Sequence, residues 1–212
     1  YRNYCFQGED YKAGTVLLQK GRRLNAGAIA VLSSLGAAEV SVYRKPRVAV
    51  ISTGDEVLAP GTPWSPGKIY DSNRAYICAR LAEAGNPPVI SIHAADEGAR
   101  VAEEIRKAAA QADFVITTGG VSVGEKDIMH EVVRLLPAEK LFWKVRIKPG
   151  SPTLAVVSQV TQVLCLYGTP FGAIANLAIL ARPVLASTTR QQTCMLEYDA
   201  AILTNAFHTR TG

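Results

Sequence analysis

The chain has 212 residues, of which 48% are apolar and 19% are charged, so its composition excludes an intrinsically disordered protein. The net charge of +5 favours anionic partners, but the densest basic cluster, Lys20 with Arg22 and Arg23, is too small to predict nucleic-acid binding. A small phosphate-bearing or oxyanionic ligand is therefore expected.

Short β-branched runs alternate with helical-period segments over residues 47–186, which predicts an α/β domain with a mostly parallel sheet. Helices should cover both faces of this sheet. Six strands are expected, over 47–52, 88–93, 113–118, 141–147, 153–157 and 163–166. Helices are expected over 26–35, from Ser72 or Asn73 to 85, over 99–110, after Asp127, and over 171–181, where Pro183 should end the last one.

Three loops have compositions typical of ligand binding, and each follows the carboxyl end of an expected strand, where open α/β sheets bind their ligands. The first follows the apolar strand expected over 47–52. It contains Thr53, Gly54, Asp55 and Glu56. Gly54 permits a tight turn, and the two carboxylates could bind a cation or polarise a hydroxyl group. A solvated turn with a helix cap is an equally good reading of this loop alone.

The second loop is rich in glycine and hydroxyl residues, and its backbone N–H groups could wrap an oxyanion at the start of a helix. Its residues include Gly119, Gly120, Val121, Ser122, Gly124 and Asp127. Asp127 could cap the following helix or face Glu56 as a cation ligand. No Gly-Lys-Ser/Thr follows, so a Walker-type nucleotide hydrolase is disfavoured.

The third loop carries Lys144, Arg146 and Lys148 on alternate positions of an expected strand that leads into the turn 149–152. Such a face is usually solvated, but at the end of a parallel sheet it could clamp a phosphate. Asp96 and Asp10, taken singly, are more readily explained as caps or surface acids.

The four cysteines and three histidines are scattered, without the spacing of a zinc site or a disulfide framework. No apolar stretch approaches the roughly 20 residues that cross a bilayer, and no signal peptide is evident. These features predict a cytoplasmic protein that is not inserted in a membrane.

Four stretches resemble the molybdopterin molybdenumtransferase family in sequence, order and spacing: STGDEVLAPG at 52–61, GKIYDSNR at 67–74, TTGGVSVGEKD at 117–127 and FWKVRIKPGSP at 142–152. The segment GEDYKAGTVLLQKG at 8–21 is also similar. This family includes the C-terminal domain of gephyrin. The resemblance implies a three-layer molybdopterin-binding α/β domain over 47–186, a remnant of an N-terminal linker region over 1–46, and the start of an incomplete C-terminal β domain over 187–212.

The resemblance also implies an activity, namely insertion of molybdate into adenylylated molybdopterin with release of AMP and with Mg²⁺ as the divalent cation. An elongated homodimer is implied, with molybdopterin adenylyltransferase as a candidate partner.

The family's functional residues match positions in all the loops described above. Acids matching Asp10, Glu56, Asp96 and Asp127 are functional in the family, and those matching Glu56 and Asp127 hold magnesium. Lysines matching Lys144 and Lys148 lie in the molybdate and pterin pocket. The remaining implied pterin- or nucleotide-binding positions are Thr53, Gly54, Gly119, Gly120, Val121, Ser122, Gly124, Pro149, Ser151 and Pro170.

The chain departs from the family pattern beside the implied pocket. Tyr167 and Thr169 stand in the segment that usually reads LPGNP or LSGNP, and Ser151 stands where a lysine is common. These changes suggest reduced substrate affinity or activity.

Three other functions remain open. Molybdopterin adenylyltransferases share the fold but lack the flanking segments, and the competence-damage family has GGLGPT where this chain has GGVSVG. A non-catalytic, receptor-binding scaffold of the gephyrin type is the third.

Overall fold

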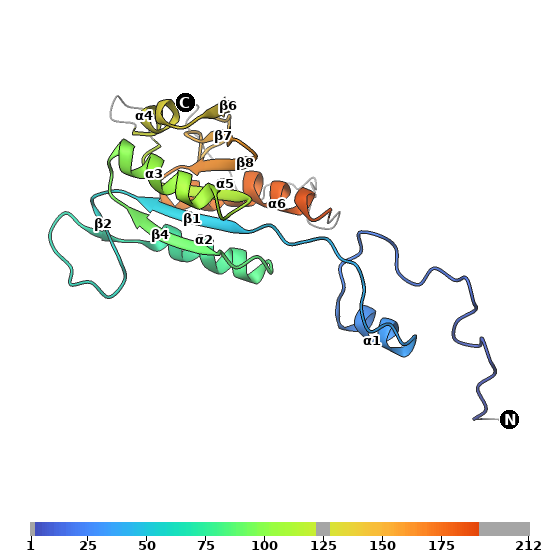
Figure 1. Ribbon diagram of the computed structural model, residues 1–212. Helices are drawn as coiled ribbons and strands as arrows, with labels where there is room; N and C mark the ends of the chain where they lie inside the picture. The colour runs from blue at the N-terminus through green and yellow to red at the C-terminus, as the bar shows by residue number, and fades with distance from the viewer. Residues whose placement is uncertain (1–2, 122–127, 191–212) are drawn as a thin grey trace, which may run out of the picture.

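The computed structural model describes residues 3–121 and 128–190 of the chain. Its body is built on one six-stranded sheet (Figure 1). The order of its strands is β4 (Ile90–Ala94), β1 (Val48–Thr53), β5 (Phe114–Thr118), β8 (Thr161–Leu166), β7 (Leu154–Ser158) and β6 (Ala138–Trp143). The first four strands are parallel, whereas β7 is antiparallel to both of its neighbours. The mostly parallel six-stranded sheet predicted from the sequence is confirmed.

Helices pack on both faces of the sheet because alternate strand residues point to opposite sides. On one face Ile51 and Val115 pack with α3 (Gly98–Ala109) and α4 (Ile128–Leu135). On the other, Val50 and Ile116 pack with α2 (Ser72–Glu83) and with the helical segment that follows β8. Both β1 and β5 are buried along their whole length, as expected for central strands covered on both faces.

The helix after β8 continues further than the sequence predicts, so the expected end at Pro183 is wrong. It comprises α5 (Pro170–Asn176), a π-helical turn η1 (Leu177–Ala181) and α6 (Arg182–Thr188). In the π turn the Arg182 N–H bonds to the carbonyl of Leu177, five residues back. This wider turn precedes Pro183 and accommodates a residue that has no N–H to donate and a ring that would clash in a regular helix.

The resulting continuous helix, Pro170–Thr188, has 19 residues and is apolar enough to span a membrane by length and composition alone. The expectation that nothing approached this length is therefore wrong for the described residues. However, its Leu177, Ala181 and Leu185 are buried in the core against the sheet and α2. We therefore interpret this helix as a core helix of the α/β domain.

Strand β6 also differs from its predicted bounds, because it ends at Trp143 and not at 147. Lys144 adopts a left-handed backbone conformation, with φ of 67°, which breaks the extended run. The backbone N–H groups of Lys144 and Val145 then bond to the carbonyls of Thr153 and Ser151. The prediction that Lys144, Arg146 and Lys148 alternate along a strand is therefore wrong, since they lie in an irregular loop.

An N-terminal arm leaves the body at the amino end of β1 and carries the predicted helix, α1 (Ala26–Ser34) (Figure 1). Asn25 caps α1 by accepting a hydrogen bond from the Ala28 N–H. Arg44 and Arg47 anchor the base of the arm through ion pairs with Asp113, just ahead of β5. Hydrogen bonds from these arginines lower the pKa of the Asp113 carboxyl group. The extended runs predicted around 195–203 lie outside the described residues.

Candidate functional site

The loops that follow β1, β4, β5 and β8 meet at the carboxyl edge of the sheet, because these strands run in the same direction. Thr53 Oγ1, at the end of β1, donates a hydrogen bond to Asp96 Oδ1 at 3.0 Å. The backbone N–H of Asp96 in turn donates to Asp55 Oδ1 at 3.1 Å. The structure thus brings two predicted site residues, Thr53 and Asp96, together, and shows that Asp55 holds the turn that carries Asp96.

Glycines allow the loop backbones at this edge to approach one another closely. Gly119 has a φ of 93°, and a Cβ placed on it would lie 2.2 Å from the carbonyl oxygen of Thr53. Gly54, with φ of 137°, leaves room for the Glu56 carboxylate, which would lie 2.8 Å from an added Cβ. Gly168, in the loop after β8, packs directly against Gly119. A ligand at this edge would meet polar backbone groups instead of bulky side chains.

The remaining predicted residues of the glycine loop divide into two groups. Gly120 also has a positive φ, of 68°, and lies against Ile128 and Thr53. Val121 buries its side chain in the core between the sheet, α3 and α4, so only its backbone could serve a ligand. Ser122, Gly124 and Asp127 lie outside the described residues.

Carboxylates at the carboxyl edge have the chemistry that a magnesium ion requires. Asp55 and Glu56 are exposed in the loop after β1, and the neighbouring Asp96 is partly exposed. Carboxylate oxygen is the ligand type that Mg²⁺ prefers. Residues 3–121 and 128–190 contain no group of three acids, histidines or cysteines close enough to hold a metal. These donors fit the cation in type, and the predicted second ligand, Asp127, is outside the described residues.

A buried polar network lies beneath the loops and was missed by the sequence analysis. Asp71, only 4% exposed, accepts hydrogen bonds from Ser52 Oγ at 2.5 Å, from Arg74 Nε at 2.7 Å and from the Arg74 N–H at 3.0 Å. Burial of the Asp71 carboxyl group opposes its ionisation, but these hydrogen bonds outweigh that effect and lower its pKa. His93 Nδ1 lies 3.1 Å from Ser52 Oγ; because the serine hydroxyl donates to Asp71, this nitrogen must carry the proton in that contact.

The same network corrects the predicted cap of α2. Asp71, and not Ser72 or Asn73, is the N-cap residue. This frees the Asn73 side chain, whose Nδ2 donates to Thr118 Oγ1 at 3.1 Å and to the carbonyl of Gly168 at 2.7 Å. Residue type alone could not show that Asp71 is the cap and Asn73 the donor, because asparagine and aspartate are both common in turns and caps. The signal in the sequence was the family-like stretch at 67–74, which contains both residues.

The basic loop between β6 and β7 is fixed from below by Asn176 of α5. The buried Asn176 Nδ2 donates to the Gly150 carbonyl at 3.0 Å and to Thr153 Oγ1 at 2.5 Å. Gly150, with φ of 109°, has no space for a side chain because the Asn176 amide oxygen occupies it. Above this anchor, Lys144, Arg146, Lys148 and Pro149 are exposed, and Ser151 is half-buried. Pro170 is exposed in the first turn of α5.

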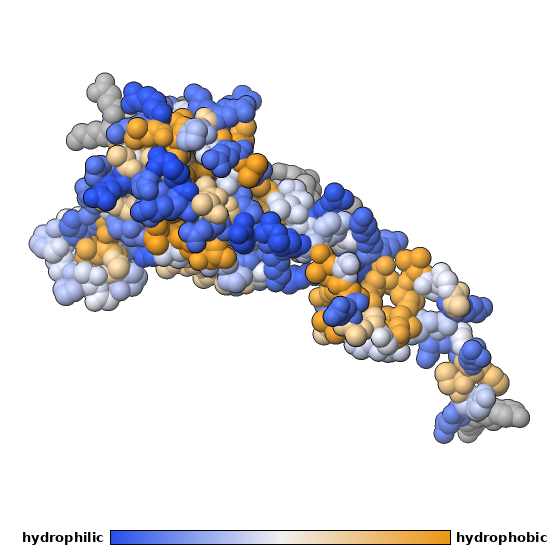
Figure 2. Space-filling view, in the orientation of Figure 1, coloured by the Kyte–Doolittle hydropathy of each residue, from blue (hydrophilic) through white to orange (hydrophobic). Residues whose placement is uncertain are grey.

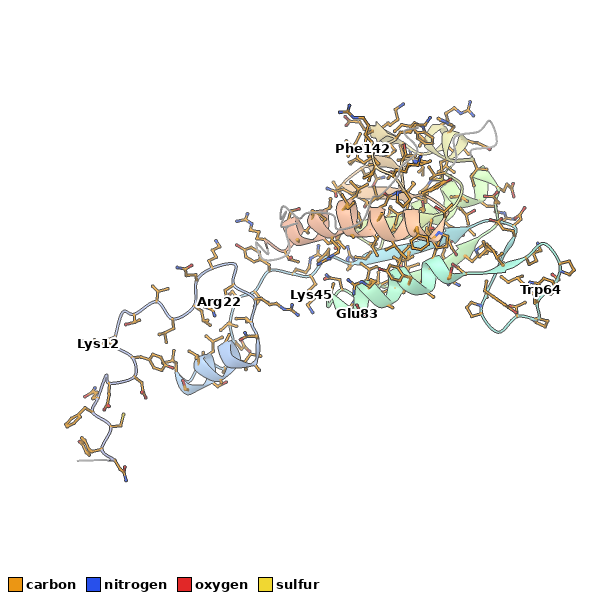
Figure 3. The ribbon with its side chains drawn as sticks, turned by 180° about the vertical axis from the view of Figure 1, so that it is seen from behind. Lys12, Arg22, Lys45, Trp64, Glu83 and Phe142 are labelled. Atoms are coloured by element: carbon orange, nitrogen blue, oxygen red, sulfur yellow. The ribbon has the colours of Figure 1, made fainter. Side chains whose placement is uncertain are left out.

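Asp10 is the one predicted site residue in the described part of the chain that the fold keeps away from this edge. It is exposed in the arm. In Figure 3, Lys12 marks the distant part of the arm, while Trp64 marks the loop between β2 (Val57–Leu58) and β3 (Ile69–Tyr70), which projects beyond the carboxyl edge. The two labelled residues lie at opposite ends of the molecule, so Asp10 cannot join Asp96 and Glu56 within one chain.

A hollow of about 250 Å³ lies at the other end of the body, where the arm joins it. It has an apolar floor that includes Leu81 and Leu185, and arginines at its rim, Arg23, Arg80 and Arg182. None of the residues predicted to bind substrate lines it. We therefore assign the candidate site to the carboxyl edge, where the polar loops meet.

Comparisons with known proteins identify the family of the α/β domain. Residues 49–187 match the family model described as "Probable molybdopterin binding domain". The molybdopterin molybdenumtransferase of Bacillus subtilis is 36% identical over 205 residues, which are 97% of this chain and 48% of that protein. The corresponding enzyme of Haemophilus influenzae is 38% identical over 186 residues, covering 87% and 46% respectively.

Solved structures give the same result. The crystal structure of the molybdopterin biosynthesis MoeA protein from Pyrococcus horikoshii has a TM-score of 0.78 and 34% identity, over 87% of this chain and 46% of that one. The chain thus spans about half the length of the relatives it matches. It belongs to the molybdopterin-binding domain family, and it is similar to about half of the length of molybdopterin molybdenumtransferases.

Proposed function

We propose that the protein containing this chain inserts molybdate into adenylylated molybdopterin with release of AMP, and that this chain supplies its pterin-binding domain. The observation that carries the proposal is the meeting of the Thr53, Gly119 and Gly168 backbones at the carboxyl edge. This contact leaves a surface of polar backbone groups bordered by acids and by the loop of exposed lysines.

In the proposed mechanism the described residues bind and orient the substrate. Backbone N–H groups of the loop at Gly119 and Gly120 would donate hydrogen bonds to the phosphate oxygens. Lys144 and Lys148 would attract molybdate and offset negative charge as it develops. Glu56, together with Asp127, would hold Mg²⁺, which when bound neutralises pyrophosphate charge. Asp96 would present a carboxylate at the same edge, in the orientation set by Thr53 and by the contact with Asp55.

The proposal extends to the rest of the molecule. Residues 1–46 would belong to an N-terminal linker region and 187–212 to the start of a C-terminal β domain. We further propose a cytoplasmic homodimer that receives its substrate from an adenylyltransferase. The arm supports the dimer because it exposes large apolar side chains, among them Val16, Ile29 and Leu35. Figure 2 shows apolar surface on the arm. Sedimentation of the chain should therefore show self-association.

Calorimetric titration with AMP, in the presence of MgCl2 and molybdate, tests the binding part of this proposal. We expect binding that requires magnesium and that weakens at least tenfold in Glu56→Ala, because a ligand of the cation is lost. Glu103→Ala is the matched control, since Glu103 lies on α3, away from the carboxyl-edge loops, and forms ion pairs with Arg106 and Lys107 of the same helix. Absence of AMP binding by both the chain and the longer protein would refute the proposed function.

A further inference from the structure

The loops after β5 and β8 are tied together by a residue that belongs to neither strand. Asn73, in the first turn of α2, donates from Nδ2 to Thr118 Oγ1 at 3.1 Å and to the Gly168 carbonyl at 2.7 Å. An amide nitrogen carries two protons, so both are used by these two acceptors. The acceptors are 50 residues apart in the chain, and Asn73 therefore fixes the end of β5 relative to the loop after β8.

The position of Gly168 matters because its neighbours leave little freedom for adjustment. A Cβ on Gly168 would touch the Gly119 Cα at 3.4 Å, and Gly119 already lies against the Thr53 carbonyl. Three backbones thus lie in contact at the candidate site. Because a peptide unit is planar, fixing the carbonyl of Gly168 also fixes the direction of the Thr169 N–H. The bond from Asn73 consequently orients the peptide group that leads into α5.

Asn73 can act in this way because the start of α2 is itself anchored. Asp71 accepts one bond from the Arg74 N–H, which caps the helix, and another from Ser52 Oγ at the end of β1. Ser52 and Asp71 are both almost completely buried. The helix therefore cannot rotate about its axis without breaking buried hydrogen bonds, which are costly to leave unpaired.

We propose that Asn73 is a positioning residue of the phosphate-binding edge, held in place by Asp71, and that it sets the spacing between the Gly119 and Gly168 backbones. This inference rests on the proposed function for the identity of the ligand only. The coupling of the two loops is a property of the fold, and it can be measured without any ligand.

The test compares Asn73→Asp with Asn86→Asp in the full 212-residue chain. Asn73→Asp keeps the size of the side chain but removes both donated protons and places a carboxylate beside the Gly168 carbonyl. Asn86 is a matched control just beyond the other end of α2, because the one hydrogen bond that its side chain makes within the described residues is a 3.5 Å contact with the Ala84 carbonyl. Amide hydrogen exchange is measured over 117–121 and 166–170, AMP affinity with MgCl2 is measured by calorimetry, and thermal unfolding is followed for all three proteins.

We expect Asn73→Asp to speed exchange in both loops about tenfold and to weaken AMP binding by a similar factor, with little change in the melting temperature. Asn86→Asp should change neither loop. Unchanged exchange in Asn73→Asp would overturn the proposal. Faster exchange throughout the domain with a large fall in melting temperature would also overturn it, since Asn73 would then be a general stability residue. If the unaltered chain binds no AMP, the proposed function fails, while the exchange data still decide the positioning role.

Discussion

Replacement of Gly119 by alanine should destabilise the domain more than replacement of a glycine with the same backbone conformation elsewhere. An added Cβ at Gly119 would lie 2.2 Å from the Thr53 carbonyl oxygen, and φ there is 93°. Because the clashing atom belongs to the backbone of a buried strand, no side-chain rotation can relieve it. The left-handed conformation costs alanine roughly 1–2 kcal/mol, and overpacking adds about 1–3 kcal/mol.

Gly61 provides the control because its φ is 90° and nothing lies within 4 Å of its added Cβ. Gly61→Ala should therefore show only the conformational cost. Urea unfolding followed by circular dichroism should give a Gly119→Ala free energy of unfolding lower than that of Gly61→Ala by about 2 kcal/mol, with the same m-value. Equal losses in the two variants would show that the Gly119 backbone does not lie against Thr53, and would remove the main support for the candidate site.

Two further predictions concern buried or paired polar groups. Asp113→Asn should lower the free energy of unfolding at pH 7 by about 1 kcal/mol. Pairing with Arg44 and Arg47 lowers the pKa of Asp113 from its ordinary 3.8. The stabilisation by this pair is therefore fully present above pH 3.8 and is lost as the pH falls below that value towards the pKa of the folded protein. A difference between the two proteins that does not shrink below pH 4 in urea titrations would contradict this. Asn176→Leu should cost about 1–3 kcal/mol, since it removes the hydrogen bonds that Asn176 donates to the Gly150 carbonyl and to Thr153 Oγ1, and should speed hydrogen exchange in the basic loop. Unchanged stability and exchange would show that Asn176 does not hold that loop.

Sequence patterns identified the sheet correctly where burial alone determines the structure. The continuous apolar runs of β1 and β5 have no other stable location than the centre of a covered sheet. The amphipathic pattern of α3 likewise places Val101 and Ile105 against the sheet. Gly54 was predicted to permit a tight turn, and Gly119 and Gly120 were predicted to lie in a loop whose backbone could wrap an oxyanion; all three have a positive φ.

The errors arose where one backbone angle or one tertiary contact decides the outcome. Nothing in the residue type of Lys144 indicates a left-handed conformation, so the end of β6 was misplaced. Pro183 normally ends a helix, but the π turn before it depends on packing that local sequence does not encode. The roles of Asp71 and Asn73 depend on which residues lie opposite the start of α2. The partners of Asn73, Thr118 and Gly168, are 45 and 95 residues away from it in the chain.

Because four strands run in the same direction, the two ends of the domain differ: the candidate site lies at the carboxyl ends of the strands, and the arm is attached at the amino end of β1. Parallel strands place their carboxyl ends at the same edge of the sheet, so the loops that follow β1, β4, β5 and β8 lie close enough to form one site. The arm leaves at the amino end of β1, where Asp113 fixes its base through Arg44 and Arg47. Asp10 lies in this arm, and the nearby Lys12 is at the opposite end of the molecule from Trp64 in Figure 3, so Asp10 is remote from the site of its own chain. If Asp10 takes part in the proposed reaction, it must do so at the carboxyl edge of a second copy, and the apolar arm is then part of the machinery that joins two copies.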